Sequence, residues 1–210
     1  MDATFFDRDP IAVARDLLGC GFRRQLDGRW TGGIIVETEA YLSRDDPASH
    51  SARGCTPSNQ SMFGPAGRLY VYPIHAKYCV NFVTQRRHTG AAVLIRALQP
   101  VWNLDGMRDR RQQSDPRRWT SGPAMICQAM QIDRSCDGLD ILSSRRWSLN
   151  PDHRVEPTEI TAGPRIGVSK GAELPLRFFI DGNRFVSGRA SDHRRPRCQS
   201  IPVGLHGSQK

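Results

Sequence analysis

The chain has 210 residues, of which 38% are hydrophobic, and its formal net charge is +9. A chain of this length can bury one sizeable core, so one domain is expected rather than two. Of its 30 Lys and Arg residues, only Lys77, Lys170 and Lys210 are lysines. Because the planar guanidinium group matches phosphate oxygens, this bias favours a polyanionic partner such as nucleic acid. An arginine-rich composition without functional meaning is the alternative that charge alone leaves open.

Several classes of protein are disfavoured. The six cysteines contain no C-x-x-C pair and no other paired metal-ligand spacing, so neither a metal nor a cofactor is expected. The N-terminal stretch lacks the basic start and apolar core of a secretory signal. No apolar run approaches the ~20 residues that a membrane helix needs. We therefore expect an intracellular, cytoplasmic protein with no membrane partner, associated with the nucleoid if its source is bacterial.

The N-terminal part of the chain predicts one helix and two strands. A helix should begin at Pro10 and end before Gly19, because proline suits the first helical position and apolar residues recur at helical spacing. Residues 33–41 and 68–74 have the composition and alternation of strands. The polar segment between these strands is long, and such a loop inside a compact domain is usually functional or disordered.

The remaining residues predict a mixture of elements. These are a strand at 91–98, a helix from Pro100 to Arg111, a helix at 122–132 capped by Ser121, an irregular stretch at 143–159, a strand at 164–168, and a hairpin of 176–180 and 184–188. Few of the predicted strands are joined by crossover helices. We therefore expect an α+β fold, a single domain with a curved, mainly antiparallel sheet flanked by short helices. The domain should span 1–190, and the basic tail 191–210 should be disordered.

The segment GGIIVETEAY combines an apolar strand with two carboxylates and a phenol. If the strand continues through it, side-chain alternation places Glu37, Glu39 and Tyr41 on one face. Two acids beside an aromatic ring make a poor core and a plausible reaction site. A strand-end carboxylate paired with an arginine is the alternative reading of Glu39 taken alone.

Further motifs follow this segment in a fixed order. They are A-x-H (48–50), T-P-x-N (56–59), M-F (62–63), Y-V-Y (70–72), C-x-N (79–81), L-I-R-A-L (94–98) and S-G-P-x-x-x-C-Q-A-M (121–130). From about residue 12 to 186 the chain thereby resembles the 3-methyladenine (alkyladenine) DNA glycosylase family. The resemblance implies a monomeric, monofunctional hydrolase of base excision repair. Its partner would be double-stranded DNA containing alkylated or deaminated purines, which it would flip out before cutting the N-glycosidic bond.

The resemblance also implies a catalytic set. Glu39 would deprotonate the attacking water and stabilise an oxocarbenium-like transition state, with Glu37 in a supporting role. Arg96 would help Glu39 to position the water or bind a nearby phosphate, and the main-chain carbonyl of Ile166 would contact the water. A buried salt bridge without catalytic meaning is the alternative for Arg96.

The same resemblance implies a base-binding pocket. Tyr41, His50 and Tyr72 would form an aromatic cage, which attracts a cationic alkylated purine by ~0.5–2 kcal/mol. Asn81 would lie at the pocket floor and disfavour the 2-amino group of normal guanine. Taken singly, each aromatic residue is more often part of a core or rim, the histidine is more often solvated, and Asn81 could be a turn residue.

One departure from the family concerns the wedge that fills the space left by the flipped base. Where the family has Tyr-Gly-Met, this chain has His75, Ala76 and Lys77, and it is one residue shorter before Cys79. We expect His75 to be the wedge and Lys77 a phosphate contact, since an imidazole can stack between bases.

Two other functions compete with this prediction. The first is a non-catalytic DNA-binding module of the same fold. The second is a glycoside or nucleoside hydrolase, which would use two carboxylates across one bond. Glu37 and Glu39 lie too close on one strand face to flank a substrate. Because no lysine falls within the cage motifs, a Schiff-base mechanism is not expected, and the enzyme should leave an intact abasic site.

Overall fold

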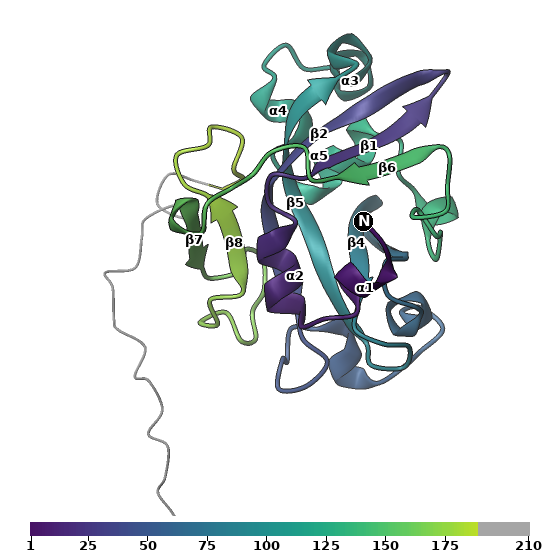
Figure 1. The fold of residues 1–210 in the computed structure, drawn as a ribbon, viewed down its shortest axis with the longest axis vertical. Coiled ribbons are helices and arrows are strands. Elements are labelled where there is room, and N and C mark those ends of the chain that lie inside the picture. Colours follow the sequence, from purple (N-terminus) through teal and green to yellow (C-terminus); the bar gives the residue numbers. More distant parts are fainter. Residues whose placement is uncertain (189–210) are drawn as a thin grey trace, which may run out of the picture.

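The computed structural model describes residues 1–188, which are organised around one eight-stranded sheet (Figure 1). The strands are β1 (Gly21–Leu26), β2 (Arg29–Tyr41), β3 (Leu69–Ile74), β4 (Lys77–Thr84), β5 (Ala91–Trp102), β6 (Trp147–Asn150), β7 (Ile160–Gly163) and β8 (Arg177–Ile180). Their order is β3-β4-β5-β2-β1-β6, and β8 pairs with both β2 and β7. Every pairing among these strands is antiparallel, which confirms the predicted α+β class.

Short helices flank this sheet in the described part of the chain. The α-helices are α1 (Ala3–Phe6), α2 (Pro10–Asp16), α3 (Leu104–Arg111), α4 (Arg117–Thr120) and α5 (Pro123–Ala129). Single 3-10 turns occur at η1 (His50–Arg53), η2 (Gln60–Phe63), η3 (Arg134–Cys136) and η4 (Pro157–Glu159). Two of these turns, η1 and η2, lie in the long polar segment that precedes β3.

Helix α2 forms as predicted and covers one face of the sheet. The carboxylate of Asp9 accepts hydrogen bonds from the first two free N–H groups of the helix, and Pro10 occupies its first position. Val13 and Ala14 are buried in the main core. The Thr38 hydroxyl donates a 2.8 Å hydrogen bond to the Ala14 carbonyl. Thr38 of β2 thus faces α2, and its neighbours on the strand face the opposite side.

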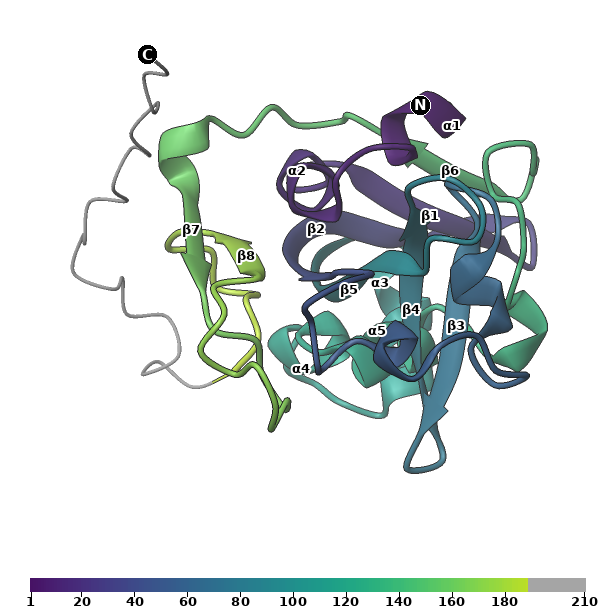
Figure 2. The ribbon, with the colours of Figure 1, turned by 90° about the horizontal axis from the view of Figure 1, so that it is seen from below.

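Strand β2 changes partner along its length. One edge pairs with β5 from Gly32 to Tyr41, whereas the other pairs with β1 up to Ile34 and with β8 from Glu37. The register with β5 shifts on both sides of Glu37. Figure 2 shows β7 and β8 beside β2, reached by a long connection from β6. This change of neighbour lets a late segment of the chain reach the carboxylates of β2.

Two predicted helix starts are wrong. Residues 100–102 continue β5, and helix α3 begins at Leu104 after Asn103, whose side chain caps it. Pro100 is tolerated in the strand because the register with β2 is irregular at this point. Ser121 does not cap α5, since Gly122 precedes Pro123 and the Ser121 hydroxyl is buried without a hydrogen-bond partner.

The strands predicted at 164–168 and 184–188 are also wrong. Strand β7 ends at Gly163, and the next residues form a loop in which Arg165 binds the Asp46 carboxylate and the Ile166 amide binds the Glu39 carboxylate. Residues 184–188 turn back toward β2 without forming a strand, so the hairpin predicted for 176–180 and 184–188 does not form, and β8 pairs with β2 and β7 instead. The predicted irregular stretch at 143–159 contains β6, which pairs with β1.

The predicted tail 191–210 lies outside the described residues, so the domain boundary at residue 190 stays a prediction. Among residues 1–188, no helix has both the length and the apolar character needed to cross a membrane.

The close approach of β2 and β5 gives a test of the fold. A Cβ atom at Gly33 would lie 2.1 Å from the Gln99 carbonyl oxygen. Gly33→Ala should therefore separate the two strands and lower the free energy of unfolding by about 1–3 kcal/mol. Gly163→Ala is the control, because its nearest neighbour, a Phe179 ring carbon, would lie 4.0 Å away. Equal urea midpoints for the two variants would contradict this packing.

Candidate functional site

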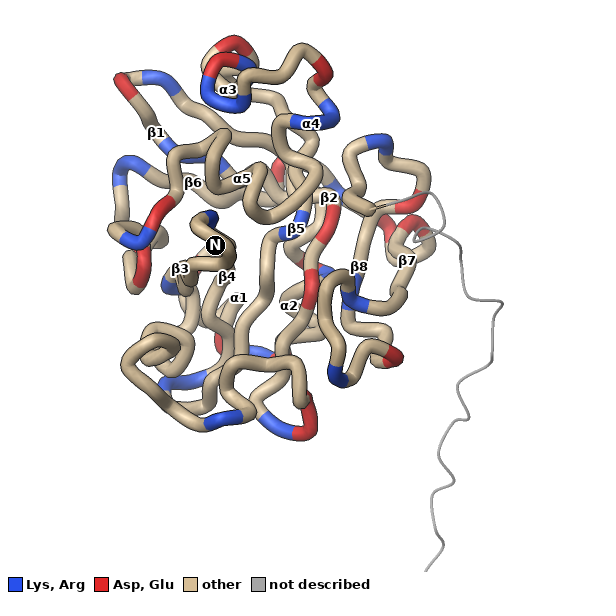
Figure 3. The backbone as a smooth tube through the Cα atoms, turned by 180° about the vertical axis from the view of Figure 1, so that it is seen from behind, with Lys and Arg blue, Asp and Glu red and all other residues tan. Residues whose placement is uncertain are grey.

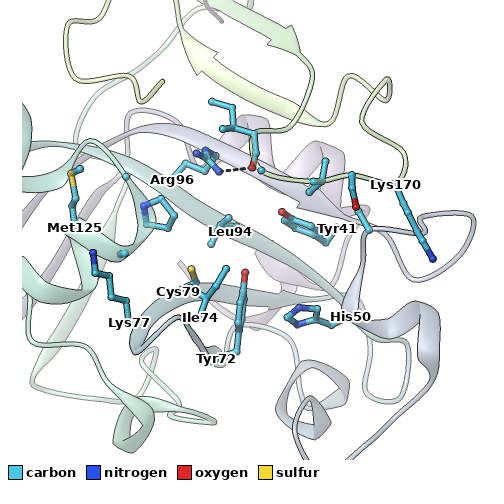
Figure 4. A pocket seen from close by; sticks show the side chains of 18 of the residues that line it. Tyr41, His50, Tyr72, Ile74, Lys77, Cys79, Leu94, Arg96, Met125 and Lys170 are labelled. Carbon is cyan, nitrogen blue, oxygen red and sulfur yellow. Dashed lines mark hydrogen bonds between the residues drawn. The ribbon is translucent and has the colours of Figure 1, made fainter. Parts of the chain in front are cut away.

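A cavity of about 660 Å³ opens on the face of the sheet opposite α2 (Figure 4). Strands β2, β3, β4 and β5 form its base, Arg111 at the end of α3 borders it, and three further segments form its walls. These are the loop from Pro47 to Arg53, the start of α5 with Gly122, and the loop from Ile166 to Lys170. Its size lies within the range of small-molecule and cofactor pockets.

The three predicted aromatic residues lie together in this cavity. Tyr41, His50 and Tyr72 all line it, and the rings of His50 and Tyr72 meet edge to face with centroids 4.5 Å apart. The His50 Nδ1 atom lies 2.7 Å from the hydroxyl of buried Tyr70, which fixes the ring. Burial lowers the pKa of His50, so the imidazole is neutral near pH 7. The three rings suit a flat, aromatic ligand.

Asn81 lies deeper than the three cage residues. It is a buried residue in the middle of β4, not a turn residue, and its Nδ2 atom donates a 3.0 Å hydrogen bond to the Tyr70 carbonyl. With the cage rings it lines a small space of about 20 Å³ beneath them. The structure therefore brings Asn81 to the floor of the cage.

Glu39 is fully buried immediately behind the cavity wall. Its carboxylate accepts hydrogen bonds from the Ile166 amide at 2.8 Å and the Tyr41 hydroxyl at 2.9 Å, and lies 3.3 Å from Nη1 of Arg96. These three partners line the cavity, whereas Glu39 does not. Burial raises the pKa of Glu39, although Arg96 and the hydrogen bonds oppose that shift.

Glu37 points to the same side of β2 as Glu39 and shares Arg96 with it, but its other partners differ. Its carboxylate accepts a 2.5 Å hydrogen bond from Arg177 and a 3.3 Å hydrogen bond from Arg96. Because Arg96 contacts both Glu37 and Glu39, the prediction that the two acids share one face of β2 is confirmed. In Figure 3, acidic segments of β2 lie in the interior between β5 and β8. Glu37 thus compensates the buried charge of Arg177 and lies away from the cavity.

A separate buried ion pair, outside the Arg96 network, was not predicted from the sequence. Arg165 binds both carboxylate oxygens of Asp46 at 2.7 Å, and both side chains are inaccessible to solvent. Arg165 also donates to the Ala40 carbonyl, and its guanidinium carbon lies 4.7 Å from the centre of the Tyr41 ring. The pair joins the two loops that border Tyr41. Sequence spacing gives no signal for it, because the partners are 119 residues apart.

Ile166 acts through its main chain. Its amide donates to Glu39, as described above, and its carbonyl accepts a 3.3 Å hydrogen bond from Arg96. A carbonyl oxygen has two lone pairs, so this one retains capacity for a second donor at the cavity wall.

The hairpin of β3 and β4 projects beside the cavity and ends in a strained turn. His75 and Ala76 both have positive φ values, 45° and 60°, in a two-residue connection between Ile74 and Lys77. These four residues are exposed, and Ile74 retains 43% of its accessible surface. Ile74 and Lys77 also line the cavity. An apolar side chain next to His75 at the exposed tip was not singled out by the sequence analysis.

Basic side chains surround the opening of the cavity. They are Arg53, Lys77, Arg111 and Lys170. By contrast, Arg108 forms ion pairs with Asp105 and Asp109, so it contributes little free positive charge. Within residues 1–188, no group of three or more His, Cys, Asp and Glu side chains is placed to hold a metal ion.

Fold and cavity together define a protein that holds an aromatic cage against a buried, arginine-paired glutamate. The sequence model of the methylpurine-DNA glycosylase family matches residues 4–184, so the chain belongs to that family, as its motifs predict. A relative from Rhodopirellula baltica is 55% identical over 206 residues, covering 96% of this chain and 88% of the relative. One from Methanoculleus marisnigri is 45% identical over 193 residues, covering 90% and 99%. Both bear the name "Putative 3-methyladenine DNA glycosylase".

The buried pair of Asp46 and Arg165 predicts an acid-dependent loss of stability. Burial raises the pKa of Asp46, but hydrogen bonds and the charge of Arg165 outweigh it, so the net shift is downward. The ionised pair therefore stabilises the fold above the unfolded pKa of about 3.9 and is lost as pH falls through the folded pKa. Asp46→Asn should lower the free energy of unfolding by about 3–5 kcal/mol at pH 7.

Denaturant unfolding between pH 3 and 7 checks this expectation. The difference between the wild type and Asp46→Asn should shrink toward pH 3. Asp16→Asn is the control, because the pair of Arg8 and Asp16 is exposed and is worth less than about 1 kcal/mol. A pH-independent difference, or equal losses in the two variants, would contradict the assignment.

Proposed function

We propose that the protein is a monofunctional DNA glycosylase that removes alkylated or deaminated purines from duplex DNA. The observation that carries this proposal is the position of Glu39, buried directly behind an aromatic cage and bound by three groups that themselves line the cavity. The family and the names of its relatives support the same activity.

The cage accounts for recognition of the base. A purine between Tyr41, His50 and Tyr72 gains roughly 1–3 kcal/mol from stacking, and a cationic purine gains about 0.5–2 kcal/mol more. Neutral His50 adds no repulsion toward a cationic lesion. The proposed role of Asn81 is to crowd the 2-amino group of guanine, and its position under the rings supports that role.

The proposed chemistry uses the charges next to the cavity. Water attacks C1′ of the flipped nucleotide as the bond to the base breaks, and the sugar gains positive charge in the transition state. Ionised Glu39 accepts the proton of this water and stabilises that charge. Arg96 keeps Glu39 ionised and oriented, while the free lone pair of the Ile166 carbonyl accepts a hydrogen bond from the water.

The exposed hairpin tip supports a role in base flipping. His75, with Ile74 beside it, would enter the duplex and occupy the space of the extruded nucleotide. The basic side chains at the opening, Lys77 among them, would hold the phosphates on either side.

The positions of the two carboxylates bear on both competing functions. A glycoside hydrolase with paired acids needs both carboxyl groups to face the substrate, whereas Glu37 lies outside the cavity lining and its carboxylate is bound by Arg96 and Arg177. A non-catalytic DNA-binding module is favoured by one observation, the absence of Glu39 from the cavity lining. Catalysis therefore requires the wall in front of Glu39 to admit a water when DNA binds.

Base release is the decisive measurement. Duplexes carrying a single 3-methyladenine, 7-methylguanine, ethenoadenine or hypoxanthine are incubated with excess enzyme, and abasic sites are counted after alkali. The wild type should release at least one of these bases. Glu39→Gln should reduce the rate by about 100-fold or more while binding the lesion duplex as tightly, because only the general base is lost.

Glu173→Gln is the control, since Glu173 is an exposed carboxylate and its removal should leave the rate unchanged. Strand breaks that form without alkali would contradict a monofunctional enzyme. Binding of lesion DNA by the wild type without any base release would favour the binding-module alternative.

His75 and His88 form a matched pair for testing the wedge. Both are exposed histidines with positive φ in turns at opposite ends of β4. His75→Ala should weaken binding to lesion duplexes by about tenfold, the loss of one stacking contact, and should spare activity on single strands. His88→Ala should change neither property. Equal losses on single and double strands in His75→Ala would contradict the wedge assignment.

A further inference from the structure

The segment that follows β8 returns to the carboxylates of β2. Phe185 and Val186 are buried against Val36, Ala97 and Phe179, in a small cluster separate from the main core. This packing holds the next residue, Ser187, which is 4% exposed, beside the buried charges.

Each polar group of Ser187 meets a charged side chain. Its amide donates a 2.7 Å hydrogen bond to Glu37. Its hydroxyl oxygen accepts a 3.2 Å hydrogen bond from Nη2 of Arg96, and its carbonyl accepts one of 3.2 Å from Arg177. The residue therefore connects the acid and the two arginines of this network.

These contacts complete the fixation of Arg96. Its Nε atom donates to Glu37, and its Nη1 atom donates to the Ile166 carbonyl and lies against Glu39. Its Nη2 atom donates to the Ser187 hydroxyl. Since a guanidinium group is planar and rigid, one partner on each nitrogen defines both its position and its rotation.

We propose that Ser187 is a positioning residue, whose hydroxyl holds the Arg96 guanidinium in the orientation that keeps its Nη1 atom against Glu39. The effect of Ser187 on the reaction rate rests on the proposed function, whereas its effect on the pKa of Glu39 rests on the geometry alone. Removing the hydroxyl leaves Nη2 of a nearly buried guanidinium without this acceptor. Arg96 then rotates to regain a partner, because an unsatisfied buried donor is costly.

The variant Ser187→Ala tests this proposal, with Asn183→Ala as its control. Asn183 lies in the same segment, where its side chain bonds Gln99 and the Phe185 amide, but it does not touch the charge network. Asn183→Ala therefore loosens the segment without removing the hydroxyl. In single-turnover base release at saturating enzyme, Ser187→Ala should be about tenfold slower than wild type. Its affinity for the lesion duplex and the rate of the control should stay within twofold of wild type.

A second readout does not depend on activity. Titration of Glu39 by carbon-13 NMR reports its pKa, which Arg96 lowers and which Glu37, on the same strand, raises. Tyr41 on that strand and the Ile166 amide also bond the carboxylate, and Arg165 faces it from the adjoining loop. Moving Arg96 away should raise the pKa of Glu39 in Ser187→Ala and leave it unchanged in Asn183→Ala.

The outcomes separate the two proposals. A raised pKa of Glu39 together with slower release supports the positioning role. An unchanged pKa, or an equal rise in both variants, overturns it even if the wild type proves inactive. An inactive wild type with a raised pKa in Ser187→Ala would overturn the proposed function and leave the positioning role supported. A wild-type rate in Ser187→Ala would overturn its role in turnover.

Discussion

The pairing of buried charges is the constraint on which the rest of this structure depends. Glu37, Glu39 and Asp46 are buried among three buried arginines, and each acid lies against at least one of them. A buried charge without a partner costs several kcal/mol, so the backbone must bring these side chains together from distant parts of the chain. Loops that carry little apolar surface are thereby held in one position. The cavity takes its shape from these loops.

The sequence predicts the elements whose local pattern of apolar and polar residues matches their burial. Periodic apolar residues and a proline start locate α2, and apolar alternation locates the central parts of β2 and β5. The order of the motifs predicts that the cage residues lie together, and the structure places Tyr41, His50 and Tyr72 in one cavity.

Other elements depend on contacts that no local pattern encodes. Strand β1 has the sequence GFRRQL, and its two central arginines interrupt the apolar alternation that would predict a strand, although it pairs on both edges. Arg165 and Arg177 resemble surface residues until their acid partners are known, because those partners lie 119 and 140 residues away. The segment at 184–188 has a strand-like composition, yet its amides bind side chains: the Phe185 amide donates to the Asn183 side-chain oxygen and the Ser187 amide to the Glu37 carboxylate. In each case tertiary pairing overrides local propensity.

The change of neighbour along β2 has a consequence for how the protein is made. Glu37 accepts hydrogen bonds from Arg96, which follows it by 59 residues, and from Arg177 and Ser187, which follow it by 140 and 150 residues. During synthesis Glu37 therefore leaves the ribosome long before two of its partners, Arg177 and Ser187, and such non-local contacts form late and slowly. Until then the carboxylates stay hydrated and the arginine network is incomplete. The complete charge network can therefore form only after Ser187 has been synthesised.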